Sequence, residues 1–173
     1  MSKGIVQTVA AALLLAGAPI IVEASEDSEM SDIQSWANEH PGGARSGSSE
    51  LWVDPTGNDA ETSDATLQVG ADGIRYAWSY RGKPQAGEFH WHDDGVTWQD
   101  SWHQPEAVQL SPVTGHGALH AAEYSYPAGT GPDWHWRIKL AARPDGSSVV
   151  QMVNIAPWSE EARAVRLVLG KSQ

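Results

Sequence analysis

From Leu51 onward, apolar and polar residues alternate with a period of two, in short runs that turn residues separate. This period places successive side chains on opposite faces of a β-strand, so each run predicts a strand with one buried face. No helical period lies between the runs, which predicts an all-β domain of about ten short antiparallel strands. The runs are Glu50–Val53, Ala65–Val69, Ile74–Arg81, Gln85–His92, Val96–His103, Ala107–Leu110, Ala118–Tyr126, Trp134–Ala141, Ser148–Ala156 and Ala162–Leu169.

The connections between these runs indicate how the strands are arranged. They contain turn residues, such as Asp72-Gly73 and Pro144-Asp145-Gly146, that are typical of short hairpins. An open sheet of successive hairpins would expose an edge strand, which promotes aggregation. Closure into an up-and-down barrel removes both edges, so the pattern favours a barrel, with a two-sheet sandwich as the alternative.

The first 49 residues follow a different pattern. Residues 1–24 carry Lys3 and then an apolar run, which predicts a cleaved secretory signal peptide, with an uncleaved N-terminal anchor as the alternative. Residues 25–49 are acidic and then rich in Gly and Ser, and they predict one short helix, Asp32–Glu39, followed by a flexible linker. The barrel domain is therefore expected over residues 50–173.

The stretch Gly87–Glu106, GEFHWHDDGVTWQDSWHQPE, is rich in both histidine and tryptophan. Its Asp94-Gly95 pair predicts a two-residue turn, which places Trp91 opposite Trp98. Opposed residues share a face, so the register sorts the side chains into two sets. The inward set is Phe89, Trp91, Trp98, Asp100 and Trp102, and the outward set is Glu88, His90, His92, Thr97, Gln99, Ser101 and His103.

The preceding strand joins the same sheet across Lys83-Pro84. This register places Trp78 opposite Phe89 and adds further rings to the inward face. On the outward face it places Arg75 beside His92. Two neighbouring cations repel each other, so a metal ion held by the histidines would lie close to an unfavourable charge.

Nine tryptophans against a single phenylalanine are the strongest compositional signal. Tryptophan brings a large apolar ring together with an N–H group that needs a partner, which suits a cavity for an amphipathic molecule. A small hydrophobic or amphipathic ligand in the barrel interior is therefore expected, and the alternative is a filled barrel that acts as an interaction module. The candidate lining residues are Tyr76, Trp78, Tyr80, Phe89, Trp91, Trp98, Asp100, Trp102, Tyr124, Trp134 and Trp136.

Two enzymatic alternatives remain open. His90 and His92 form the His-x-His pair that zinc enzymes place on one strand, although a zinc site needs three or four ligands. Asp100 lies among aromatic side chains, where burial could raise the pKa of its carboxyl group and suit it to acid–base work. The structural alternative is that Asp100 accepts a hydrogen bond from a Trp, a Tyr or an Arg side chain.

Charge and cysteine content narrow the range of partners. The formal net charge of −11 argues against a nucleic-acid partner and against binding to an anionic membrane surface. No cysteine is present, which suits a periplasmic or secreted bacterial protein that its core alone stabilises. No phosphate-binding or dinucleotide-binding motif occurs, so no cofactor is expected, and the sequence leaves the oligomeric state open.

Several strand motifs resemble a known family. The segments YRGKPQAG, DSWH, WHWRIKL and MVNIAP resemble a bacterial family of unknown function with a lipocalin-like, or calycin, barrel. The resemblance covers roughly Leu51–Leu169 and implies an up-and-down barrel without an established activity. Barrels of this kind generally bind small hydrophobic molecules, and some related ones hold haem through a histidine. Family members usually open with Gly-x-Trp, whereas this chain has Glu50-Leu51-Trp52 there.

Overall fold

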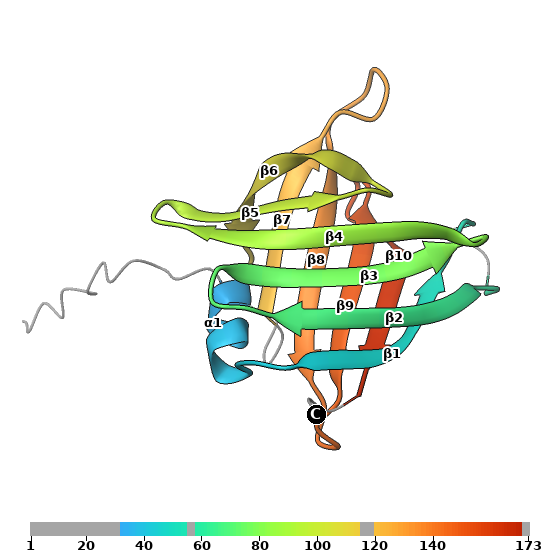
Figure 1. Cartoon of the computed structure of the whole chain (residues 1–173). Helices are drawn as coiled ribbons and strands as arrows, with labels where there is room; N and C mark the ends of the chain where they lie inside the picture. Colours follow the sequence, from blue (N-terminus) through green and yellow to red (C-terminus); the bar gives the residue numbers. More distant parts are fainter. Residues whose placement is uncertain (1–31, 55–57, 115–119, 171–173) are drawn as a thin grey trace, which may run out of the picture.

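The computed structural model describes residues 32–54, 58–114 and 120–170, so the predicted signal peptide lies outside the described residues. Ten antiparallel strands form a closed barrel in the order β1-β10-β9-β8-β7-β6-β5-β4-β3-β2, as the alternation predicted (Figure 1). The elements are α1 (Asp32–Glu39), β1 (Ala44–Leu51), β2 (Glu61–Val69), β3 (Gly73–Tyr80), β4 (Lys83–His92), β5 (Gly95–Asp100), β6 (Gln104–Pro112), β7 (His120–Tyr126), β8 (Trp134–Ala142), β9 (Ser148–Ile155) and β10 (Glu161–Leu169). Among the described residues, no helix is long and apolar enough to cross a membrane.

Strands β2–β5 run across the front of the barrel in Figure 1, and β7–β10 cross behind them at a steep angle. The inward positions of both groups fill the space between them with large apolar side chains, because burying one face of each strand removes these side chains from water. The largest fully buried side chains are Ile33, Trp36, Leu67, Ile74, Phe89, Val96, Trp98, Ile138, Leu140, Met152, Leu167 and Leu169.

The hairpin registers differ from the predicted ones by even numbers of residues. The β4–β5 turn is Asp93-Asp94, so Phe89 rather than Trp91 pairs with Trp98. Gly95 has a φ of 129°, which side chains rarely adopt, so the glycine is needed directly after the turn and not within it. An even shift keeps each side chain on its predicted face.

The β3–β4 connection shows a shift of the same kind. Its turn is Arg81-Gly82, in which both residues have positive φ, and Ile74 rather than Trp78 lies opposite Phe89. Arg75 therefore pairs with Glu88 and does not lie beside His92, which corrects the predicted pairing. Two residues with positive φ match the right-handed twist of the flanking strands, which explains the tight turn.

Strand β1 begins inside the segment that the sequence analysis predicted to be a linker. Its inward positions include Arg45, Gly47 and Ser49, which are polar or small, so the alternation of apolar residues is hidden there. A side chain at Gly47 would collide with the carbonyl oxygen of Val168 on β10. The barrel is thus closed by a β1–β10 pair that only glycine permits at this point.

Helix α1 covers one end of the barrel, and its bounds are those predicted. It packs against β7, β8 and β3, and Ile33 and Trp36 are fully buried. The buried Arg45 reaches the C-terminal end of the helix, where its guanidinium donates to the carbonyl oxygen of His40 at 3.4 Å and to Ser148 Oγ. A cation stabilises the negative end of the helix dipole, so Arg45 holds α1 in place.

Candidate functional site

The end of the barrel opposite α1 has a different character. Here β3, β5, β7 and β9 end, at Tyr80, Asp100, Tyr126 and Ile155 (Figure 1). We call this end the mouth. Its aromatic side chains are not all covered: Tyr80, Tyr126 and Trp134 are half-buried, and Trp102 is 37% exposed. The mouth is therefore an accessible aromatic surface, whereas α1 covers the other end.

The residues between β5 and β6, Ser101–His103, form a turn that places two rings at the mouth. Trp102 contacts Trp78 and Tyr80 edge-on, with ring centroids 5.9 and 4.8 Å apart. Edge-to-face contacts at these separations are favourable for aromatic rings. Trp102 thus covers one side of the mouth, and it projects from a turn rather than from a strand.

His103 covers the other side of the mouth. Its ring stacks on Trp136 with centroids 3.7 Å apart, and its centroid lies 5.1 Å from that of Tyr126. Burial lowers the pKa of His103 to about 4, so the imidazole is neutral at physiological pH. The prediction that His103 faces solvent was wrong, because β5 ends at Asp100 and the turn leads the chain back over the mouth.

Asp100 holds this turn through both carboxylate oxygens. Oδ1 accepts the backbone N–H groups of Trp102 and His103 at 2.7 and 3.1 Å. Oδ2 accepts the hydroxyl of Tyr76 at 2.6 Å, and Trp98 Nε1 donates to that hydroxyl at 3.0 Å. The structural alternative for Asp100, a hydrogen bond from a neighbouring side chain, is confirmed.

The environment of Asp100 perturbs two pKa values. Burial raises the pKa of Asp100, and the three hydrogen bonds it accepts oppose that rise. Burial and then the charge of Asp100 raise the pKa of Tyr76 well above its ordinary value. Gly87 leaves the space for this pair, because a side chain there would collide with the Tyr76 hydroxyl.

Several ring nitrogens near the mouth are buried without a hydrogen-bond partner among the described residues. They are Nε1 of Trp78, Nε1 of Trp136 and Nε2 of His103. Other polar atoms there are paired: Tyr124 donates to Gln104 at 3.3 Å, and Tyr126 donates to Asn154 at 2.7 Å. The unsatisfied groups are therefore the nitrogens of the ring systems.

The structure brings some predicted residues together and separates others. Trp78, Tyr80, Asp100, Trp102, Tyr124, Trp134 and Trp136 lie at or near the mouth, together with Tyr76 beneath it. Phe89 and Trp91 lie farther along β4 towards α1, and Trp98 packs between the two regions. Four further residues at the mouth were not among the predicted lining residues: His103, Gln104, Tyr126 and Asn154. For His103 a signal existed, since Asp readily accepts the backbone N–H two residues later and so marks a turn.

His90 and His92 lie on the outer face of the sheet, as predicted. His90 Nε2 is 3.1 Å from Glu88 Oε2, and His92 Nε2 is 2.9 Å from the hydroxyl of Thr97. Within residues 32–54, 58–114 and 120–170, no group of three or more His, Cys, Asp or Glu side chains is placed to hold a metal ion. The histidine pair therefore has no third ligand in the described part of the chain.

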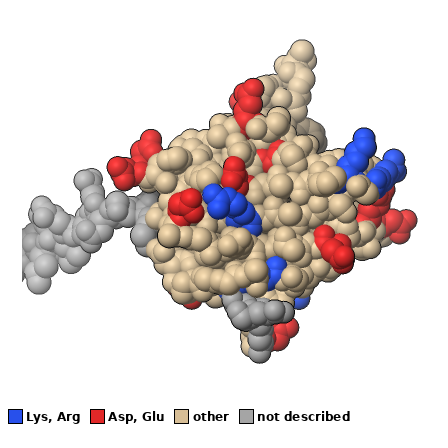
Figure 2. All heavy atoms as spheres, in the orientation of Figure 1, with Lys and Arg blue, Asp and Glu red and all other residues tan. Residues whose placement is uncertain are grey.

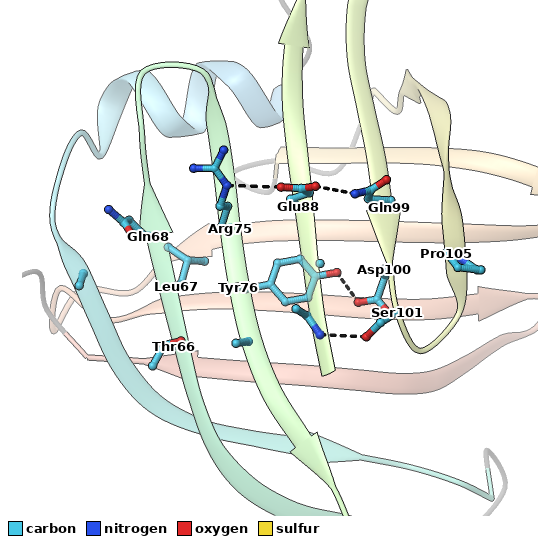
Figure 3. A pocket seen from close by; sticks show the side chains of 14 residues that line it. Thr66, Leu67, Gln68, Arg75, Tyr76, Glu88, Gln99, Asp100, Ser101 and Pro105 are labelled. Carbon is cyan, nitrogen blue, oxygen red and sulfur yellow. Dashed lines mark hydrogen bonds and ion pairs between the residues drawn. The ribbon is translucent and has the colours of Figure 1, made fainter. Parts of the chain in front are cut away.

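A hollow of about 570 Å³ lies over β2–β5 (Figure 3), and most of its lining side chains point outward from the barrel. Small residues such as Ala77 and Ala86 form its floor. Arg75, Glu88 and Gln99 lie side by side across it, with Arg75 Nε 3.3 Å from Glu88 Oε2. Figure 2 shows basic and acidic side chains adjacent on this face, so much of the charge is locally compensated.

No family model, curated protein or solved structure matches the chain. The function is therefore inferred from the sequence and from the geometry of the barrel.

Proposed function

We propose that the protein binds a small, flat amphipathic molecule at the mouth of the barrel. The observation that carries this proposal is the contrast between the two ends. Helix α1 covers one end, while the other presents partly exposed rings, including Tyr80, Trp102, Tyr126 and Trp134. Small-molecule sites are lined mainly by apolar and aromatic side chains with a few polar groups.

The architecture of the mouth supports this proposal. Rings offer a large apolar area with little conformational entropy to lose on binding, and stacked or edge-on contacts add to that area. Trp102 and His103 lie on a turn that Asp100 holds through two backbone N–H groups, so both rings are positioned before a ligand binds. The polar groups of Gln104 and Asn154 lie beside the rings and give the site an orientation.

The enzymatic alternatives have less support. Asp100 is 2% exposed and both of its oxygens already accept hydrogen bonds, which leaves it poorly placed to exchange protons with a substrate. A metal-dependent reaction through His90 and His92 would need a ligand from outside the described residues. Export to the periplasm, and membership of the lipocalin-like family, remain part of the proposal and rest on the sequence.

A fluorescence titration tests the proposed function. The neutral probe N-phenyl-1-naphthylamine becomes fluorescent when it enters an apolar site, and we expect it to bind the full chain. Tyr126→Ala removes a ring of the mouth and should weaken binding by about tenfold, the usual scale for one aromatic contact. Circular dichroism establishes that the variant is folded.

Ala77→Gln is the matched control, because it partly fills the outer hollow and lies one strand farther than Ala86 from the turn that forms the mouth. We expect it to bind the probe as the unmodified chain does. Loss of binding in Ala77→Gln, with unchanged binding in Tyr126→Ala, would place the site on the outer face and overturn the proposal. An absence of binding in every protein would overturn it as well.

A further inference from the structure

We infer that the molecule bound at the mouth is uncharged and carries hydrogen-bond acceptors, such as the oxygens of an aromatic ketone or lactone. This inference rests on the proposed function and concerns the same site. It follows from the hydrogen-bond groups that the barrel leaves unpaired and from the charges that surround them.

The unpaired groups at the mouth are mainly donors. Trp78 and Trp136 are only 4% and 3% exposed, and neither indole N–H has a partner among the described residues. An indole nitrogen can donate a hydrogen bond and cannot accept one. A buried donor without a partner is unfavourable, so an acceptor on the ligand would relieve it.

The acceptors near these indoles are already occupied. The carboxylate of Asp100 accepts hydrogen bonds from three donors. The hydroxyl of Tyr124 donates to the side-chain oxygen of Gln104, and the hydroxyl of Tyr126 donates to that of Asn154. A ligand rich in donors would therefore find few free partners. A ligand with acceptors meets the two indoles, and His103, whose Nε2 is also buried without a partner among the described residues, stacks on one of them, Trp136.

The two indoles lie on either side of the turn that carries Trp102 and His103. Trp102 contacts Trp78, and His103 stacks on Trp136. An indole N–H points along the plane of its ring, so an acceptor would have to reach the edge of Trp78 or Trp136 while the body of the ligand contacts the rings of the turn. The rings of the turn thus mark where the body of the ligand lies.

The charges at the mouth disfavour an anion. Asp100 lies beneath the rings, and Glu106, Asp133 and Glu160 lie on the connections or strand ends around them. Two cations also lie at this end: Arg81 is paired with Glu61 at 3.3 Å, and Lys83 lies opposite Tyr80 at the start of β4. The acidic side chains named above outnumber them. A cation would be attracted by this field, yet it cannot accept a hydrogen bond from the indoles. An uncharged acceptor satisfies both conditions.

Trp52 provides an internal control for the indole argument. Its Nε1 is also buried without a partner among the described residues. It follows β1 at the same end of the barrel but lies outside the core cluster, against the guanidinium groups of Arg163 and Arg166 at 4.7 and 5.4 Å from its ring. A ligand at the mouth should leave the N–H signal of Trp52 unchanged.

Two bicyclic probes of similar size separate the acceptor from the apolar surface. Coumarin is uncharged and has two lactone oxygens, whereas naphthalene has no hydrogen-bond acceptor and is more hydrophobic. Each probe is titrated into the full chain, and binding is followed by the indole N–H signals in nitrogen–proton correlation spectra. Trp78→Phe, Trp136→Phe and Trp52→Phe assign three of these signals by their loss.

We expect coumarin to bind about tenfold more tightly than naphthalene, as one or two added hydrogen bonds imply. Coumarin should shift the N–H signals of Trp78 and Trp136 and leave that of Trp52 unchanged. In Trp78→Phe and Trp136→Phe, the preference for coumarin over naphthalene should fall. If a variant does not fold, the shifts of the indole N–H signals in the unmodified chain still test the inference.

Three results would overturn the inference. Equal or tighter binding of naphthalene at the mouth would show that acceptors do not matter, and the proposed function would stand. Tighter binding of coumarin-3-carboxylate than of coumarin would show that the ligand is an anion. No binding of any probe would overturn both the inference and the proposed function.

Discussion

A single carboxylate organises the mouth at the residue scale. Asp100 is charged and almost fully buried, which is unfavourable unless hydrogen bonds compensate, and here three donors do so. Two of these donors belong to the backbone of the turn, so the charge also fixes the position of Trp102 and His103. Asp100 is therefore a positioning residue for the rings that cover the mouth.

The stability of the protein should depend on pH through His103. Its pKa is about 4 in the folded state, and the imidazole of the unfolded chain takes up a proton near pH 6.5. The unfolded state therefore binds more protons between these values, so stability falls as pH is lowered from 6.5 to 4. The loss is at most about 3 kcal/mol, because one pKa unit corresponds to about 1.4 kcal/mol.

Urea unfolding at several pH values checks this prediction. His103→Phe keeps the ring stack and removes the titration, so its stability should fall less over the same range. Asp100 acts in the opposite direction, because its raised pKa favours the folded state at low pH, and the variant retains that contribution. His92→Gln, on the outer face, should behave as the unmodified chain; equal slopes in His103→Phe and the unmodified chain would contradict the prediction.

At the scale of elements, helix α1 depends on one buried arginine. Arg45 connects the C-terminal end of α1 with Ser148 on β9. Its guanidinium carbon also lies 5.7 Å from the centroid of the Trp36 ring. Burial lowers the pKa of Arg45 from its ordinary value. The helix has only eight residues, so its stability comes from packing and from this contact rather than from helix propensity.

Arg45→Met should loosen α1 and lower the free energy of unfolding by about 1–3 kcal/mol, since it removes hydrogen bonds from a charged donor. Hydrogen exchange of the α1 amides and urea unfolding measure the two effects. Arg81→Met is the control, because the ion pair that Arg81 forms with Glu61 is exposed and should contribute less than about 1 kcal/mol. Equal effects of both substitutions would show that Arg45 does not hold the helix.

Closure is the property that belongs to the whole molecule. Strands β1 and β10 are far apart in the chain and pair from Gly47–Leu169 to Leu51–Val165. Closure removes the two sheet edges that would otherwise be open to pairing with another chain. It also creates two distinct ends, and only this difference gives the mouth its separate character.

Gly47→Ala should therefore impair closure, because the new Cβ would collide with the backbone of β10. We expect a loss of about 2 kcal/mol or more in unfolding free energy, with a lower yield of soluble protein. Gly131→Ala is the matched control, since nothing lies within 4 Å of a Cβ built there, and its stability should change by less than about 0.5 kcal/mol. A stable, soluble Gly47→Ala protein would contradict this explanation of closure.

The sequence predicted much of the fold and part of the site. The strands, the barrel, helix Asp32–Glu39 and the inward position of the Trp-rich face all follow from short-range pattern. The first strand was predicted at Glu50–Val53, whereas β1 begins at Ala44, because its buried positions Arg45, Gly47 and Ser49 give no apolar alternation. His103 was placed on the wrong side because alternation was extended past the end of β5.

The sequence by itself determined which face of each strand is buried, because side chains alternate strictly and an even shift in register leaves that face unchanged. Only the tertiary structure decided which residues are neighbours. The Phe89–Trp98 pair depends on turn geometry, the Asp100 hydrogen bonds depend on where β5 ends, and the mouth depends on the closure of β1 onto β10. These features arise from contacts between distant segments, which local alternation does not encode.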